Sequence, residues 1–312
     1  MRADLETLRN VMYSEGGRYR KTYFVNAALG SDGNDGLSHT EPIKKLRTAY
    51  DKLESLKGDR IVLQQSASFA ALANAAAGVW GKSLCTLEGT GETLMNNRSR
   101  LSQSAAFSPF LDVTGYGNVF KKFYMSNENA SASNLIGVKL SGTRNVLDRI
   151  HILNPYDAAT QGAEATATAI DISAEESYLK DCVFGSDAAA RAAGSLLRLS
   201  GGTPRLIVDN CVFLMNASAN APFFIQGTAG LGLGYAIFRG CTFLNHGTSL
   251  TYGVDGTGLN NYKIFFDSNC VFSGVTDIVA AAQESKVIFG TVPASASTDD
   301  LFGLAVAYDH TP

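Results

Sequence analysis

A cysteine, any residue and then a phenylalanine recur four times at nearly constant spacing, and this regularity restricts the fold most strongly. The motif begins at Cys182, Cys211, Cys241 and Cys270, so successive copies lie 29, 30 and 29 residues apart. A period of roughly 20 to 50 residues is typical of a chain that stacks one structural unit on the next. Segments 118–127 and 145–154 align with these copies and carry Phe123 and Ile150 in place of the cysteine. A position that accepts Phe, Ile or Cys is filled for packing, which argues against a cysteine-based activity.

Each copy contains strand-like segments and no helical pattern. The repeat segments 177–186, 206–216, 236–245 and 263–274 alternate apolar and polar residues, as in a strand with one buried face. A second strand precedes every copy, centred on 110–115, 137–142, 169–174, 197–202, 223–228 and 252–257. Two short strands with room for a third predict the coils of a right-handed parallel β-helix, because the common helical repeats need segments that these copies lack.

Stacked strands lie about 4.8 Å apart, so equivalent residues of successive coils form rows. We predict two interior rows, made of Cys182, Cys211, Cys241 and Cys270 and of Phe184, Phe213, Phe243 and Phe272. One outward position of the other strand carries Asp112, Lys139, Asp171, Arg198 and Gln226. Alternating charges on neighbouring strands are favourable by roughly 0.2–1 kcal/mol per pair, so we interpret this row as structural.

The segment before the repeats carries a succession of short motifs. They are a strand at Phe24–Val25, the turn residues Gly30–Ser31–Asp32 and Asp35–Gly36, then Pro42, an apolar stripe over 43–56, and Gly58–Asp59–Arg60–Ile61. This succession resembles the entry segment of the pectate-lyase-like right-handed β-helix superfamily, and the chain is most like its phage virion members of decoration or tailspike type. The resemblance covers roughly residues 22–290 and implies an all-β solenoid with an N-terminal capping helix. It implies little about function, because the superfamily contains lyases, hydrolases, epimerases, tailspikes and inert virion proteins.

We expect three parts along the chain. Residues 1–21 form an N-terminal docking segment, residues 22–290 form the β-helix with its capping helix near 43–56, and residues 291–312 form a C-terminal arm or cap. A cap is needed because the open end of a β-helix would otherwise present unpaired backbone groups to other chains.

Candidate site residues are few and weak. Pectate lyases of this superfamily stack aspartates to bind calcium, whereas the matching row here alternates acidic and basic residues, which does not suit a divalent cation. Asp148, Asp181 and Asp209 have the spacing of a catalytic carboxylate group, although stacked turn residues explain them equally well. Asp32, Asn34 and Asp35 suggest an ion site, but the glycine and glutamate of an EF-hand are missing at the required positions, which favours a plain turn. We predict no metal and no cofactor.

Net charge and hydropathy exclude two classes of partner, nucleic acids and membranes. The formal net charge is −3 and basic residues do not cluster, so nucleic-acid binding is not expected. The chain has no run of 18 apolar residues and no N-terminal secretory signal, so we expect neither a membrane span nor export.

The function that we predict is that of a non-enzymatic bacteriophage virion structural protein, such as a capsid decoration or surface spike protein assembled in the host cytoplasm. On the resemblance we expect a homotrimer that docks on other capsid or tail proteins. One alternative is a polysaccharide lyase or depolymerase of tailspike type. Another is an adhesin that binds surface glycans without cleaving them. Whether the chain is an enzyme is left open, with the balance against it.

Overall fold

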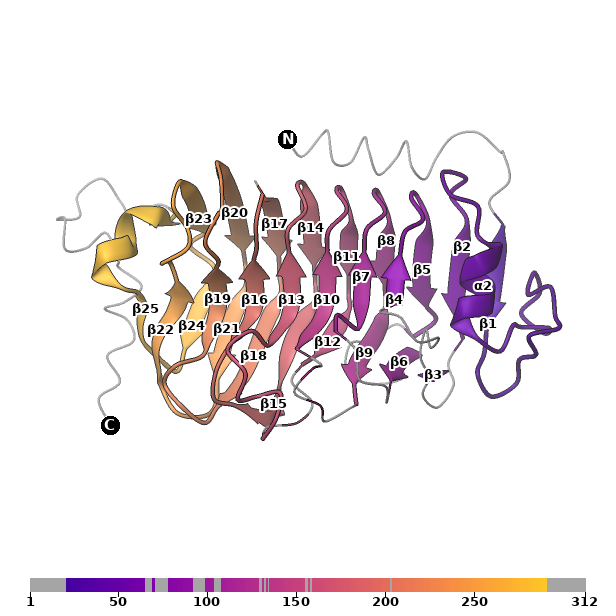
Figure 1. Ribbon diagram of the computed structural model, residues 1–312, viewed down its shortest axis with the longest axis horizontal. Coiled ribbons are helices and arrows are strands. Elements are labelled where there is room, and N and C mark those ends of the chain that lie inside the picture. Colours follow the sequence, from indigo (N-terminus) through magenta and orange to yellow (C-terminus); the bar gives the residue numbers. More distant parts are fainter. Residues whose placement is uncertain are drawn as a thin grey trace.

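The protein is a right-handed parallel β-helix, as predicted, and its strands form three long sheets (Figure 1). The computed structural model describes residues 21–64, 69–70, 78–91, 99–103, 108–128, 131, 133, 135–154, 157, 159–202 and 204–290. The predicted docking segment, apart from Lys21, and the predicted C-terminal arm lie outside these residues. Among the described residues, no helix is long and apolar enough to cross a membrane.

Each complete coil contributes one strand to each sheet, in the chain order A, B, C, while β1 and β26 at the two ends belong to sheet A alone. Sheet A contains ten strands: β1 (Thr22–Val25), β2 (Arg60–Leu63), β5 (Thr86–Gly89), β8 (Val119–Lys121), β11 (Val146–Asp148), β14 (Ser177–Lys180), β17 (Arg205–Asp209), β20 (Gly234–Arg239), β23 (Tyr262–Phe266) and β26 (Val287–Phe289). Sheet B contains eight: β3 (Phe69–Ala70), β6 (Ser99–Gln103), β9 (Phe123–Asn127), β12 (His151–Leu153), β15 (Val183–Arg191), β18 (Val212–Ala217), β21 (Thr242–Asn245) and β24 (Val271–Ser273). Sheet C also contains eight: β4 (Gly78–Trp80), β7 (Leu111–Val113), β10 (Ile136–Leu140), β13 (Thr168–Ile172), β16 (Ser195–Leu199), β19 (Phe223–Gly227), β22 (Leu250–Asp255) and β25 (Val275–Val279).

The alternating repeat segment, which the sequence presents as a single strand, is in fact two strands that meet at a sharp corner. Segment 206–216 holds β17 and β18, separated by Asn210 and Cys211, and Asn210 has a left-handed backbone with φ of 51°. Asp181 occupies the same corner one coil earlier with φ of 51°, and Gly240 one coil later with φ of 58°. Asparagine, aspartate and glycine tolerate this conformation better than other residues do, so one residue can turn the chain from sheet A to sheet B.

The interior is a set of stacked rows. Cys182, Cys211, Cys241 and Cys270 are free thiols with at most 1% of their surface exposed. Two residues further on, the ring centroids of Phe213 and Phe243 lie 4.6 Å apart, and those of Phe243 and Phe272 lie 4.3 Å apart. Parallel stacking at these distances suits aromatic side chains that repeat at the spacing of the strands.

The corner between sheets C and A contains buried asparagines. The backbone N–H and the Nδ2 of Asn118 both donate to Oδ1 of Asn145, at 2.9 and 3.1 Å. Nδ2 of Asn145 in turn donates to the carbonyls of Gly115 and Gly142, at 2.9 and 2.7 Å. These amides satisfy backbone groups that have no partner where the strands end.

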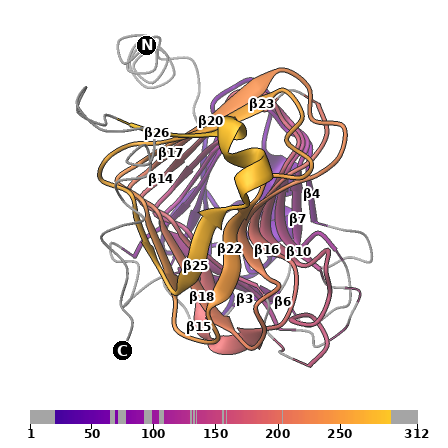
Figure 2. The same cartoon turned by 90° about the vertical axis from the view of Figure 1, so that its left-hand side faces the viewer.

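The predicted helix at the N-terminal end is present but shorter than the expected range of 43–56. Helix α2 spans Leu46–Lys52, because Ile43 forms a β-bridge with Val25 and Leu53 has an extended backbone. Its buried residues Leu46, Ala49 and Tyr50 belong to the same core as the strands. At the other end, Figure 2 shows the short 3-10 helix η1 (Ala281–Lys286) across the last coils.

Candidate functional site

The outer surface of sheet C carries two parallel rows of polar side chains, which we call the sheet C face. The charged row contains Asp112, Lys139, Asp171, Arg198, Gln226 and Asp255, in register on β7, β10, β13, β16, β19 and β22. The hydroxyl row lies two residues further along each strand and contains Thr114, Ser141, Ser173, Ser200, Thr228 and Thr257. Because side chains two apart on a strand share a face, the repeated pattern of charge, apolar residue and hydroxyl builds both rows.

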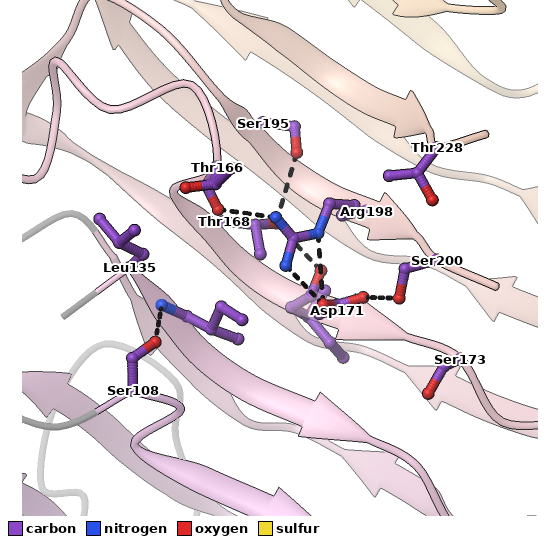
Figure 3. A network of polar contacts seen from close by, with 12 residues as sticks. Ser108, Leu135, Thr166, Thr168, Asp171, Ser173, Ser195, Arg198, Ser200 and Thr228 are labelled. Atoms are coloured by element: carbon purple, nitrogen blue, oxygen red, sulfur yellow. Dashed lines mark hydrogen bonds and ion pairs between the residues drawn. The ribbon is translucent and has the colours of Figure 1, made fainter. Parts of the chain in front are cut away.

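Asp171 forms the centre of this face (Figure 3). Nε and Nη2 of Arg198 donate to its Oδ2 at 3.2 and 2.6 Å, and the hydroxyl of Ser200 donates to its Oδ1. Nη1 of Arg198 donates to the carbonyl of Thr166 at 2.8 Å. Although Asp171 points outward from the core, only 3% of its surface is exposed. Its charge is therefore compensated by the next coil rather than by water.

Four members of the hydroxyl row, Ser141, Ser173, Ser200 and Thr228, follow a simple rule that depends on the preceding coil. Where that coil carries an aspartate, the hydroxyl donates to its carboxylate, as Ser141 does to Asp112 at 2.9 Å. Where the preceding coil carries a cation, the hydroxyl donates to a backbone carbonyl instead. Ser173 contacts the carbonyl of Leu140 at 3.4 Å and Thr228 that of Leu199 at 3.2 Å. Hydrogen bonds of this kind tie neighbouring coils together, and we call the two rows with these bonds the sheet C lattice.

Lys139 is the exception within the charged row. It is partly exposed and lies between Asp112 and Asp171 on neighbouring strands. In the part of the chain that the structure describes, no ion pair or side-chain hydrogen bond engages its ammonium group. The ammonium has three N–H donors, so it can bind an anionic or oxygen-rich ligand without first breaking a contact within the chain.

The arrangement suits binding better than a pair of catalytic carboxylates. Asp112 and Asp171 are separated by the strand of Lys139, so their backbones lie about 9.6 Å apart, twice the strand spacing. The two carboxyl groups of a retaining glycosidase lie about 5 Å apart, much closer than these two strands, whereas the roughly 6.5–9.5 Å of an inverting enzyme is near this spacing. The oxygens of Asp171 are also already bound by Arg198 and Ser200.

The three predicted catalytic candidates lie elsewhere, on sheet A and at its corner. Asp148 and Asp209 belong to a second alternating row, the sheet A charge row, made of Glu88, Lys121, Asp148, Lys180, Asp209 and Arg239. Asp148 contacts Arg149 through both carboxylate oxygens at 3.0 Å. Asp181 contacts Lys180 at 3.8 Å. Lys180 separates Asp148 from Asp209, so the structure does not bring these carboxylates together.

Asp209 is the most engaged of the three candidates. Arg239 donates to both of its oxygens at 2.5 and 2.7 Å, and the hydroxyl of Tyr178 donates to Oδ2 at 2.6 Å. Burial and this hydrogen bond to Asp209 raise the pKa of Tyr178 well above its ordinary value. The carboxylate is therefore held as a structural acceptor rather than left free for proton transfer.

The predicted ion-site candidates lie in the loop between β1 and α2. Asp32 accepts from the backbone N–H of Lys45 at 2.9 Å, and Asp35 accepts from that of Leu37 at 2.9 Å. Asn34 donates to the carbonyl of Pro42 at 2.9 Å. These contacts are those of a turn. Over the described residues, no group of three or more His, Cys, Asp and Glu side chains could hold a metal ion.

Sequence reasoning missed the hydroxyl row and the sheet A charge row. The hydroxyl row is visible as a serine or threonine at the same place in every coil, from Thr114 to Thr257. The sheet A charge row was hidden because its residues stand at the end of a segment interpreted as one continuous strand.

Comparison with known proteins supports the fold. No protein-family model and no curated protein matches the sequence. A pectin methylesterase from Erwinia chrysanthemi has a similar structure, with a TM-score of 0.56 and 9% sequence identity over 92% of this chain and 95% of that one. A mutant pectin methylesterase in complex with a hexasaccharide gives a TM-score of 0.57 at 10% identity over 92% and 95%. A pectate lyase gives 0.50 at 14% identity over 91% and 83%. At these identities the likeness establishes the parallel β-helix.

Proposed function

We propose that this chain binds polysaccharide across the sheet C face, with Lys139 contacting an acidic group of the sugar. The observation that carries the proposal is Lys139 itself, a partly exposed cation that has no partner among the described residues, in a row whose other charges are bound. A carboxylate or sulfate on a sugar would supply the missing anion, and a charge-assisted hydrogen bond of this kind is among the stronger polar contacts.

The surrounding lattice suits a polymer ligand. Serine and threonine hydroxyls can both donate and accept, and they repeat about every 4.8 Å along the face, once for each stacked strand. A chain of sugars presents hydroxyl groups at regular intervals in the same way. The similar structures of pectin methylesterases and of a pectate lyase agree with a polysaccharide ligand on this fold.

Binding to a panel of immobilised polysaccharides tests the proposal. We expect the protein to bind de-esterified pectin better than methyl-esterified pectin, and neutral dextran least. Lys139→Met should weaken binding to de-esterified pectin by about tenfold or more, as loss of a hydrogen bond to a charged group would. Arg100→Met is the control, because Arg100 is also an exposed cation on a strand but belongs to sheet B. Equal losses in both variants, or no binding to any acidic polysaccharide, would refute the proposal.

Turnover is measured on the same polysaccharides by release of reducing ends, unsaturated products and methanol. Turnover that disappears in Lys139→Met would make the sheet C face a polysaccharide-processing site. Binding without turnover would make the protein an adhesin.

A non-enzymatic role in a bacteriophage virion is the second candidate. The ion pairs that engage Asp148, Asp181 and Asp209 argue against catalysis by these three carboxylates, which agrees with the non-enzymatic part of this candidate. The virion location, the homotrimer and docking on other virion proteins stay predictions. Capsid or tail genes beside the gene for this chain would support them, and carbohydrate-metabolism genes there would count against them.

A further inference from the structure

The outer surface of sheet A carries an uninterrupted apolar row beside the sheet A charge row. The apolar row contains Val119, Val146, Tyr178, Ile207, Ile237, Phe265 and Ile288, in register from β8 to β26. These side chains are not needed inside, because Leu147, Leu179 and Val208 already fill the interior side of the same strands. Most of the row is partly exposed, and 40% of Ile288 is exposed. A contiguous apolar stripe of this kind is typical of an interaction surface.

We propose that the outer surface of sheet A is the interface of an antiparallel dimer of this chain. The two solenoids would pack face to face around a two-fold axis that runs along the strand direction, between β14 and β17. This operation keeps each row opposite the same row of the second copy and reverses the order of the coils. Tyr178 would then face Ile207 of the second copy, and Val146 would face Ile237.

The charges select this arrangement. With the same axis, Lys180 faces Asp209 of the second copy and Asp148 faces Arg239, so opposite charges meet across the interface. A parallel dimer or trimer has its axis along the solenoid, so equivalent coils face one another; with that axis over the charge row, Asp148 would meet Asp148 and Lys180 would meet Lys180. Like charges placed together in an interface are costly, whereas complementary ones set orientation and register. The row therefore favours the antiparallel dimer over the trimer that the resemblance predicts.

The face is the size of a small interface. The axis between β14 and β17 places the eight strands from β5 to β26 opposite one another, and these span about 34 Å at the usual spacing. With a width of roughly 15 Å, each partner contributes about 500 Å², so the total of about 1,000 Å² lies at the lower limit for a specific interface. Apolar side chains would supply most of the free energy, since the charged ones already have partners within the chain.

Sedimentation of the full chain over a concentration series is the first test. We expect the wild type to be a dimer and Ile207→Asp to raise its dissociation constant by roughly 100-fold or more, because the two-fold axis buries the new carboxylate twice. Val212→Asp is the matched control, since Val212 is also a partly exposed outward residue of the same coil but lies on sheet B. It should leave the dimer intact. Circular dichroism confirms that both variants are folded.

A monomeric or trimeric wild type would overturn the proposal, and so would equal dissociation of two folded variants. A monomer in which residues 1–20 cross-link to the apolar row would show that the chain covers its own face, which also overturns it.

Orientation is tested by cross-linking with a short bis-maleimide, because packed sheets lie about 10 Å apart, too far for a disulfide. The native cysteines of the described residues are buried. The double variant Val146→Cys, Ile237→Cys should give a covalent dimer, whereas either single variant should give little. A parallel dimer centred on the apolar row would instead cross-link through each single variant, and that result, or no cross-link in the double variant of a dimeric protein, would overturn the antiparallel arrangement.

Discussion

Sheets A and C place the same alternation of charge on their outer surfaces and differ in the row beside it. On sheet C, the side chains of Asp171 and Arg198 are 4% and 12% exposed, and hydroxyl groups flank them. On sheet A, those of Asp209 and Arg239 are 16% and 38% exposed, and the flanking row is apolar. Alternation is therefore a general solution for stacking charged strands. The neighbouring row decides what each face can bind, a hydroxylated polymer on sheet C and a protein surface on sheet A.

The two ion pairs should respond very differently to loss of the arginine, and this is the largest effect we expect. Arg198→Met leaves Asp171 buried without its counter-charge, which should lower the free energy of unfolding by about 3–5 kcal/mol. Arg239→Met should cost much less at protein concentrations where the chain is a monomer, because water then reaches that pair. Urea unfolding of both variants measures the difference, and similar losses would show that the two faces are not distinct.

The buried hydrogen bonds at the corner between sheets C and A can be removed without changing either outer face. Asn145→Ala removes the donor to the carbonyls of Gly115 and Gly142 and the acceptor for Asn118. The buried groups left unsatisfied should cost roughly 2–3 kcal/mol in urea unfolding. Asn210→Gly is the control, because Asn210 is exposed and its φ of 51° suits glycine. An unsatisfied buried polar group ordinarily costs about 1–3 kcal/mol. A loss below about 1 kcal/mol for Asn145→Ala would therefore contradict the prediction and show that water replaces the amide.

Both faces depend on a common interior, and its buried thiols should lower the stability of the fold at alkaline pH. Burial raises the pKa of Cys85 from 9.0 to about 11, and burial also raises the pKa of Cys211. Above pH 9 the unfolded thiol loses its proton while the folded thiol keeps it, so stability falls as pH rises from 9 to 11. Each such thiol contributes a slope of at most about 1.4 kcal/mol per pH unit. Unfolding measured against pH should show a shallower decline in Cys85→Ala, and an unchanged decline would contradict this assignment.

The smallest change in stability should come from substitution of Asp148, whose ion pair with Arg149 is partly exposed on sheet A. Its side chain is 19% exposed and that of Arg149 is 40% exposed, so Asp148→Asn should cost less than about 1 kcal/mol in urea unfolding. Polysaccharide binding should not change, because Asp148 lies on sheet A. Loss of binding with normal stability would move the binding site from sheet C to sheet A.

The periodicity predicted the solenoid because each strand repeats the same inward pattern. The corner between sheets A and B was missed because one left-handed residue turns the chain while the apolar alternation continues across it. Asp181 and Asn210 suit such a position, but Lys122 and Arg149 occupy it in earlier coils with φ of 62° and 54° and do not signal a turn. Propensity alone therefore could not separate two short strands from one long strand.

By itself, the sequence determined the repeat, the interior rows of Cys211 and Phe213 with their counterparts, and the outward placement of Asp171 and Arg198. Only the tertiary structure decided which charges meet and which face each row occupies. Arg198 binds Asp171 across 27 residues of chain, while Ser141 reaches Asp112 across 29. Because turns of different length separate the strands, such partners follow from the register of stacked coils about 4.8 Å apart rather than from distance along the chain.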